Sequence, residues 1–438
     1  MITGREQTAR ARTVELAQGA RDRIQIHLLA AGSVAPVLAA LVLAAVDGPA
    51  ARALAGALGV ALVVVPLVLI RRLELIMYTY VPLMAGVVPQ PAPVDFMTAG
   101  VLGALAIRGD IRRAAPPRAI LIALPLFIAA NVVSLLAAAR GSGPMFLAQT
   151  LLMVAVGCVG YELAAKDRKV AERAMLGAGF LLLIESMIAF SPLGDLLGMR
   201  EAGSRMRGFL TDANEFGSLA IPAILLLLVR WPSLAIHVRA IGIGLLLIPV
   251  ALSASRAAAL SLGVSAAVLA AIAAYRGLRR VFFRATSVLA IGSVGALLLV
   301  ALYGSLPERD IGSLIQPYDA ERFAAQAAGL HEYLTRPLSL GIGPGNFEAQ
   351  IGHESHQMYL RVLVESGPIA LLGLLAMIVT ALRVAARPDL NAVVWGAILA
   401  GLLASGLFID TLHWRFLWFV LGVTASFAVR EPRETGQT

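Results

Sequence analysis

The chain has 438 residues, of which 59% are hydrophobic and only 14% are charged. Soluble globular domains are about half apolar and about a quarter charged, so this composition excludes a soluble globule and indicates a polytopic membrane protein. The formal net charge of +9 would suit nucleic-acid binding only if the basic residues had no other explanation.

Apolar segments recur from Ile26 to Val429, most of them close to the length that a helix needs to cross a bilayer. We expect spans over 27–46, 50–70, 73–88, 94–107, 118–138, 145–164, 170–190, 212–230, 234–252, 257–275, 284–303, 357–382, 391–408 and 411–428. The third and fourth are the weakest, because Pro82 and the stretch PQPAPVD interrupt them, and one re-entrant pair is the alternative. The predicted fold class is an all-α transmembrane helix bundle of about 12–14 spans.

The positions of the basic residues predict the orientation of these spans. With the N-terminus in the cytoplasm, most of the 36 basic residues fall in cytoplasmic loops such as RGDIRRAAPPR and YRGLRRVFFR. Both termini are therefore expected to be cytoplasmic, and nucleic acid is not needed to explain the charge. The N-terminal tail lacks the apolar stretch of a signal peptide, and the single cysteine, Cys158, excludes an intramolecular disulfide.

One external connection is long and polar, and it divides the chain. The expected units are a cytoplasmic tail 1–26, a bundle 27–303, a periplasmic loop 304–356, C-terminal spans 357–429 and a tail 430–438. Within the loop, Phe323, Ala327, Leu330 and Leu334 share one helical stripe. We expect an amphipathic helix that lies on the membrane surface, caps the bundle and ends at Pro337.

Several arginines lie on the external side, against the positive-inside rule. Arg205 and Arg207 precede the span 212–230, Arg256 begins the span 257–275, and Arg322 and Arg336 lie in the long loop. One such arginine alone is explained by a side chain that reaches lipid phosphate. Several beside helix N-termini favour a site for a doubly charged pyrophosphate headgroup, which the planar guanidinium binds through two hydrogen bonds.

The stretch HESHQMYLRVLVESG, residues 353–367, places two histidines at the end of that loop. His353 and His356 are three residues apart, so this is not the zinc motif H-E-x-x-H, and no metal site is expected. His356 either caps a helix or acts as a general base for a sugar hydroxyl, and nearby arginines would lower its pKa and keep it neutral. Arg361 and Glu365 are expected to form an i, i+4 ion pair.

The last external turn, FIDTLHWRF, carries Asp410, His413 and Arg415. These residues are candidates for acceptor contacts or for support of the site. Trp414 and Trp418 beside them are typical of an aromatic belt at the membrane interface.

Four stretches of the chain resemble successive blocks of the O-antigen ligase and O-antigen polymerase superfamily. They are SRMRGFLTDANEFG, SASRAAAL, ERFAAQAAGLHEYLTRPLSLGIGPGNF and HQMYLRVLVESGPIALLG, in the family's order over about residues 200 to 380. Two positions depart from the family pattern, since its Pro-Asn is Ala213-Asn214 here and its His-Asn is His356-Gln357. The resemblance implies a GT-C type fold in the bacterial inner membrane and a metal-independent, inverting glycosyltransferase without a cofactor.

The resemblance also implies roles for individual residues. Arg205 and Arg256 would grip the diphosphate of an undecaprenyl diphosphate-linked glycan, and Arg207 would assist Arg205. His356 would position or deprotonate the acceptor hydroxyl on the periplasmic face. The supporting positions are Asn214, Arg322, Gln357 and Tyr359. Asn346 would shape the loop.

The sequence is compatible with three functions. A ligase would transfer the glycan to lipid A core or another glycoconjugate, whereas a polymerase would join lipid-linked repeat units. A flippase or other transporter of lipid-linked sugars would show polar residues at the bilayer midplane and broken helices in matched halves, but the polar groups here gather at one face. Membrane lipids are partners in each case.

Overall fold

The computed structural model describes residues 61–64, 73–86, 92–108, 116–138, 143–200, 205–230, 234–288, 290, 311–335 and 340–429. The predicted span 27–46, most of the span 50–70, the second half of the span 284–303 and Arg336 lie outside the described residues. In the described part the protein is all-α, and the only β-type pairing there is an isolated bridge between Arg200 and Met206.

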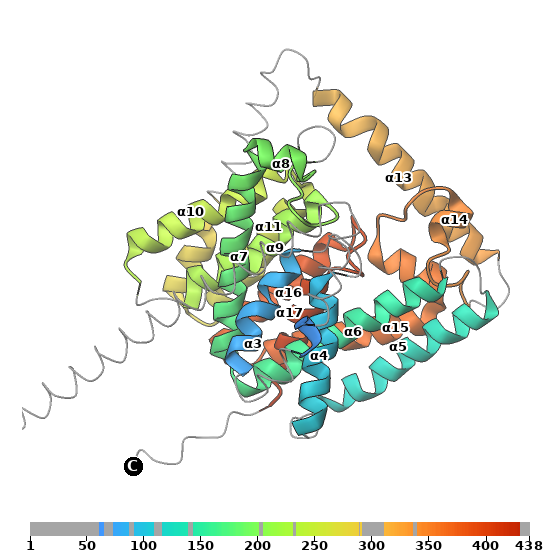
Figure 1. Cartoon of the computed structure of the whole chain (residues 1–438), viewed down its shortest axis with the longest axis horizontal. Coiled ribbons are helices and arrows are strands. Elements are labelled where there is room, and N and C mark those ends of the chain that lie inside the picture. The colour runs from blue at the N-terminus through green and yellow to red at the C-terminus, as the bar shows by residue number, and fades with distance from the viewer. Residues whose placement is uncertain are drawn as a thin grey trace, which may run out of the picture.

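The helices follow the apolar segments of the sequence closely (Figure 1). They are α3 Leu73–Tyr80, η1 Pro82–Ala85, α4 Pro93–Arg108, α5 Arg118–Ala137, α6 Gly143–Lys166, α7 Arg168–Ala189, α8 Pro192–Leu196, α9 Ala213–Arg230, α10 Ile236–Leu252, α11 Arg256–Tyr275, α13 Ile311–Leu334, α14 Phe347–Ile351, α15 Met358–Ala385, α16 Leu390–Ser405 and α17 Arg415–Ser426. Residues 279–288 are also helical. In the described part, α5, α6, α11 and α15 are long and apolar enough to cross a membrane, and α4, α9, α10, α16 and α17 are shorter apolar helices.

Contacts between helix ends define two ends of the bundle. The site face is the end where α4, α6, α9, α11, α15 and α17 begin. It is held by contacts of Asp95 with Arg415, Asn214 with Ser255, and Phe146 with Arg361. The basic face is the opposite end, where α11, α15 and α17 finish and α7 begins. There Arg168, Arg276 and Arg387 donate to main-chain carbonyls at or just beyond the last turns of α15 and α17.

Glycines bring the helices of the bundle close together. A Cβ atom on Gly422 of α17 would overlap the carbonyl oxygen of Gly157 on α6, and one on Gly401 of α16 would overlap the carbonyl oxygen of Ser261 on α11. Small residues at helix contacts are typical of bundles in lipid, where van der Waals packing replaces the hydrophobic effect. This packing fixes the relative positions of the helix ends that form the site face.

The helix α15 is broken within the bundle. Gly367 has φ 80 and ψ 176, which no helix contains, and Pro368 follows it. The expected span 357–382 is present as α15, but the break in its middle was not predicted. Proline cannot donate a main-chain hydrogen bond, so the carbonyls one turn earlier need other donors.

The glycine-rich loop supplies those donors. The main-chain N–H of Ile342 donates to the carbonyl of Val364 at 2.9 Å, and the N–H of Gly343 donates to the carbonyl of Glu365 at 3.0 Å. Gly341 has φ 83 and approaches so closely that a Cβ atom there would overlap the carbonyl oxygen of Glu365. The loop and the break therefore form one hydrogen-bonded unit.

The helix α13 begins earlier than expected and turns its predicted apolar stripe away from the protein. Phe323 and Leu334 are 67% and 70% exposed, whereas Ala325 is 3% exposed. A Cβ atom on Gly329 would overlap the ring of Phe347, so this other side of α13 packs on α14. The expected helix is present, but the stripe does not pack against the described bundle.

Candidate active site

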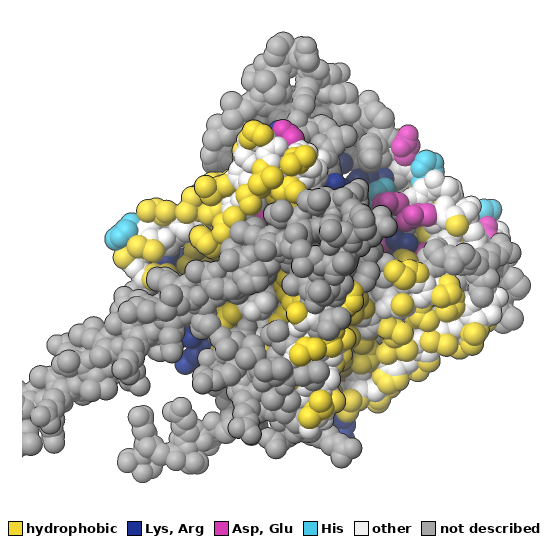
Figure 2. Space-filling view, viewed as in Figure 1, with side chains coloured by type: hydrophobic (Ala, Val, Ile, Leu, Met, Phe, Trp, Pro, Cys, Tyr) yellow, Lys and Arg dark blue, Asp and Glu magenta, His cyan; other side chains and the backbone are white. Residues whose placement is uncertain are grey.

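Charged side chains gather at one part of the molecule. Figure 2 shows hydrophobic side chains over the flanks of the bundle, with basic, acidic and histidine side chains close together near α14 and the start of α15. In the described residues no group of three or more His, Cys, Asp or Glu side chains could hold a metal ion.

His356 lies in the short connection between α14 and α15. Its φ of 46 is in the left-handed region, which is uncommon for a residue other than glycine. The connection is tied to α13 because the amide of Gln326 donates to the carbonyl of Ser355 at 3.3 Å. His356 is half-buried, and its Nδ1 lies 3.6 Å from a carboxylate oxygen of Glu354.

Four charges from separate segments act on His356. Burial lowers the pKa of His356 below its ordinary value of 6.5, and the charge of Arg322 lowers it further. The carboxylates of Asp212, Asp410 and Glu348 oppose this shift without reversing it. The imidazole is therefore neutral near pH 7, the form that accepts a proton.

Asn214 is the centre of a second group, the Asn214 cluster, which comprises Arg205, Asp212, Asn214, Ser253 and Ser255. The Oδ1 atom of Asn214 accepts from Arg205 Nη2 at 3.0 Å and from Ser255 Oγ at 2.7 Å. Arg205 Nε also donates to the carbonyl of Ser253 at 3.2 Å, and the Asn214 amide donates to Asp212 at 2.8 Å. The cluster thus joins the connection before α9 to the start of α11.

The predicted arginines occupy different positions around this cluster. Arg205 is engaged within it, and Arg256 is the exposed first residue of α11, directly after Ser255. Arg207 donates from Nε to the carbonyl of Gly198 at 3.0 Å, in the turn after α8. Because Asp212 belongs to the Asn214 cluster and acts on His356, the cluster and the histidine share one electrostatic environment.

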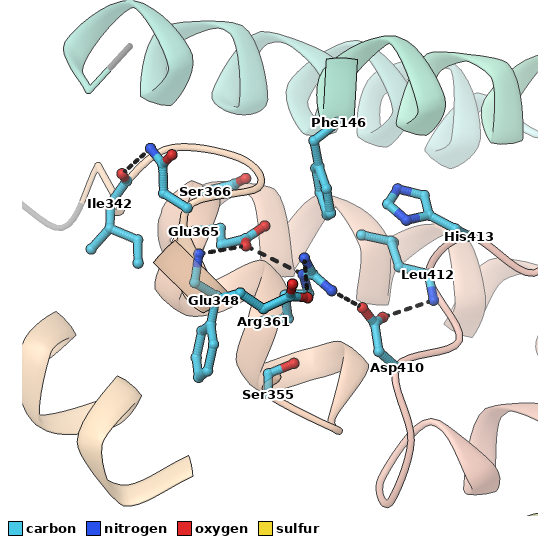
Figure 3. Close-up of polar contacts among 12 residues, drawn as sticks. Phe146, Ile342, Glu348, Ser355, Arg361, Glu365, Ser366, Asp410, Leu412 and His413 are labelled. Carbon is cyan, nitrogen blue, oxygen red and sulfur yellow. Dashed lines mark hydrogen bonds and ion pairs between the residues drawn. The ribbon is translucent and has the colours of Figure 1, made fainter. Parts of the chain in front are cut away.

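Arg361 organises a network of carboxylates near the start of α15 (Figure 3). Its guanidinium donates to Glu365 at 3.3 Å and, through a short hydrogen bond, to Asp410. It also lies 3.7 Å from Glu348 and over the ring of Phe146, 4.4 Å from the centroid. The ion pair predicted between Arg361 and Glu365 is confirmed, but the other three partners were not predicted.

Asp410 and His413 line the turn before α17. Burial alone would raise the pKa of Asp410, but the charge of Arg361 and other contacts hold it below its ordinary range. Burial is the main cause that lowers the pKa of His413 to about 4. The ring of His413 stacks edge-on against Phe146 at 4.4 Å, and its Nε2 lies 3.3 Å from Thr150.

The remaining residues of that turn have structural contacts. Arg415 forms a two-pronged ion pair with Asp95 of α4, at 2.7 and 2.8 Å, and both side chains are buried. Trp414 and Trp418 are also buried, at 5% and 3% exposure. The interpretation of these tryptophans as an aromatic belt was wrong, because they pack inside the protein.

Three further residues singled out in the sequence contact the main chain or begin a helix. Asn346 donates to the carbonyls of Ile342 and Ala138, at 2.8 and 3.1 Å, so it shapes the glycine-rich loop. The hydroxyl of Tyr359 donates to the carbonyl of Leu403 at 2.9 Å. Gln357 occupies the N-cap position of α15 without a capping hydrogen bond from its side chain.

Comparison with known proteins adds no family assignment. No protein-family model matches the chain, and no curated protein resembles it at a significant level.

Proposed function

We propose that this protein is a membrane glycosyltransferase of the O-antigen ligase type. It transfers a glycan from undecaprenyl diphosphate to a hydroxyl of a glycolipid or other glycoconjugate. The observation that carries the proposal is the neutral, half-buried His356 in one electrostatic environment with Arg322 and the Asn214 cluster. In this proposal the site face is periplasmic, the membrane is the bacterial inner membrane and both termini are cytoplasmic.

The proposed reaction is a single displacement with inversion. The acceptor oxygen forms a bond to the anomeric carbon of the donor as the bond from that carbon to the diphosphate oxygen breaks. The acceptor proton passes to the imidazole of His356, and the lipid diphosphate leaves with the bonding electrons. Acid-base assistance of this kind typically contributes about 10² to 10⁴ in rate.

The arginines have different roles in binding the diphosphate. Arg256 is exposed at the start of α11 and is assigned to the diphosphate oxygens, where it neutralises the charge that develops as the bond breaks. Arg205 holds the Asn214 cluster, which orients the first turn of α11, and it contributes positive charge from there. Arg207 and Arg322 add to the positive potential around the leaving group.

Transfer by purified protein tests the proposal. Protein in lipid nanodiscs is incubated with a diphosphate-linked oligosaccharide, either with lipid A core or with excess donor alone, and products are resolved by mass spectrometry. A conjugate on lipid A core indicates a ligase, and a lengthened lipid-linked glycan indicates a polymerase. Movement of the donor across the bilayer of proteoliposomes without a new glycosidic bond would instead establish a transporter.

Variants connect the activity to His356. His356→Ala is expected to lose transfer by about 100-fold or more, while His353→Ala, an exposed histidine of the same connection, keeps it. Thermal unfolding of both variants checks that the fold is intact. Normal transfer by a folded His356→Ala protein would falsify the proposed role.

The diphosphate contact is tested separately. Arg256→Ala is expected to reduce kcat/KM for the lipid-linked donor by about tenfold or more, because one charge-assisted contact is lost. Lys169→Ala, an exposed cation at the basic face, is the control and should retain kcat/KM. Equal losses in both variants would show that only the overall charge matters.

A further inference from the structure

Arg239, at the basic face, is a buried cation without a partner in the described structure. It lies near the start of α10, which begins at Ile236, and is only 7% exposed. Its Nε and Nη1 atoms are enclosed, and neither has a hydrogen-bond partner among the described residues. An uncompensated buried charge is strongly unfavourable, so such a side chain calls for an anion that the described residues do not supply.

Two more arginines, Arg280 and Arg284, add to the positive charge of this region. The charges of Arg239 and Arg280 both act on Arg284. Arg284 donates from Nη1 to the carbonyl of Leu228, near the end of α9, at 3.4 Å. No ion pair joins these three arginines to a carboxylate within the described part of the chain. Among the described residues, these like charges therefore have no counterion.

The start of α10 adds to this positive potential. The helix begins after Ala235, whose side chain provides no capping hydrogen bond. The first main-chain N–H groups of a helix carry partial positive charge, which repels a cation and attracts an anion. Arg239 is therefore placed where its own helix disfavours it, unless a negatively charged group lies between them.

We propose that Arg239, Arg280, Arg284 and the first turn of α10 bind a phosphate-bearing anion at the basic face. Guanidinium groups pair with phosphate through two parallel hydrogen bonds, and basic pockets between helices at the cytoplasmic surface suit anionic lipid headgroups. The ligand is an anionic phospholipid headgroup or free phosphate, which share this chemistry. The site is at the opposite end of the bundle from His356 and does not depend on the proposed transfer reaction.

Thermal unfolding of the purified full chain distinguishes the sources. Cardiolipin or phosphatidylglycerol is added to detergent-solubilised protein, with zwitterionic phosphatidylcholine as the comparison, and inorganic phosphate is tested against sulfate-free chloride at equal ionic strength. A rise in Tm with the anionic lipids alone identifies a lipid site. A rise with inorganic phosphate as well identifies a general phosphate site. No rise with either would overturn the proposal.

Variants should show two opposite effects, weaker binding of the anion and unchanged or higher stability in its absence. Arg239→Gln is expected to weaken binding of the stabilising anion by about tenfold, and Arg284→Gln to weaken it also. Without the anion, Arg239→Gln should be as stable as the wild type or more stable, because the unpaired charge is gone. Arg279→Gln is the matched control, because Arg279 is an exposed arginine of the same helical segment as Arg284.

The two signatures together decide the proposal. The proposal is supported if the wild type has a higher Tm than Arg239→Gln only when the anion is present. It is also supported if Arg279→Gln binds the anion as well as the wild type does. If Arg239→Gln loses stability equally with and without the anion, Arg239 has a packing role and the site is rejected. Equal loss of binding in Arg239→Gln and Arg279→Gln would reduce the effect to nonspecific charge.

Discussion

The two ends of the bundle use arginine in different ways. At the basic face, Arg168, Arg276 and Arg387 donate to main-chain carbonyls at or beyond the last turns of neighbouring helices. At the site face, Arg361 and Arg415 pair with buried carboxylates. A terminal carbonyl carries only partial negative charge and can be hydrated when the arginine leaves. Water cannot reach a buried carboxylate in this way, so the stability of the site face depends on keeping each carboxylate paired with its arginine.

The two faces should differ most in the free energy of unfolding that is lost when one arginine is replaced by alanine. Arg361→Ala leaves the buried Glu365 and the half-buried Asp410 without their cation and should destabilise the protein by about 3–5 kcal/mol. Arg387→Ala exposes two carbonyls that water can reach and should cost about 1 kcal/mol or less. Reversible unfolding in mixed micelles measures both changes. Comparable losses would show that the two faces do not differ in this way.

Substitution of single glycines tests the same contrast through smaller changes in stability. Gly341 and Gly352 share φ 83, but only at Gly341 would a Cβ atom overlap the main chain, at the carbonyl of Glu365. Gly352→Ala should cost about 1–2 kcal/mol, the penalty of a left-handed residue. Gly341→Ala should lose at least about 2 kcal/mol more, because the glycine-rich loop must move away from α15. Gly277, with φ 67 and open space at the basic face, should behave like Gly352.

A further expected effect is a pH dependence of stability that arises at the site face. The pKa of His413 is lowered to about 4 in the folded protein, against 6.5 for an ordinary histidine. Between these values the unfolded chain binds a proton that the folded chain does not. Stability should therefore fall as the pH drops from 6.5 to about 4, with no further loss from this group below that.

Replacement of the histidine tests the origin of that slope. His413→Gln should flatten the fall in Tm between pH 6.5 and 4, measured in one detergent across the range. His237→Gln, an exposed histidine near the start of α10, is the control for the loss of a histidine as such. A slope that persists in His413→Gln would assign the effect to other groups of the network.

Much of the helical layout was predictable because apolar length is a local property. The expected spans 118–138 and 257–275 match α5 and α11 within a residue or two. The break in α15 was missed although Gly367 and Pro368 are adjacent in the sequence, a pair that ends most helices. The prediction relied on the high hydropathy of the residues around this pair. Hydropathy does not reveal a break, because a broken helix inside a bundle is as apolar as a continuous one.

The candidate site was predictable only where its contacts are local. The Arg361–Glu365 pair follows from its i, i+4 spacing. The partner of Arg361 at Asp410 is 49 residues away, and Asp95 and Arg415 are 320 residues apart. Such pairs leave no periodic pattern in one sequence. The same holds for Arg239, whose lack of a partner becomes visible only when its neighbours in space are known.

The hydrogen bonds between the glycine-rich loop and the break in α15 bear on how this protein can be engineered. A chimaera that grafts a foreign segment over 340–346 would remove the loop donors of the carbonyls of Val364 and Glu365, and only the carbonyl of Glu365 would keep a second donor, the hydroxyl of Ser134. Inside a membrane no water would replace those donors. A successful exchange therefore has to transplant residues 364–368 together with the loop, as a single cassette whose two halves lie apart in the sequence.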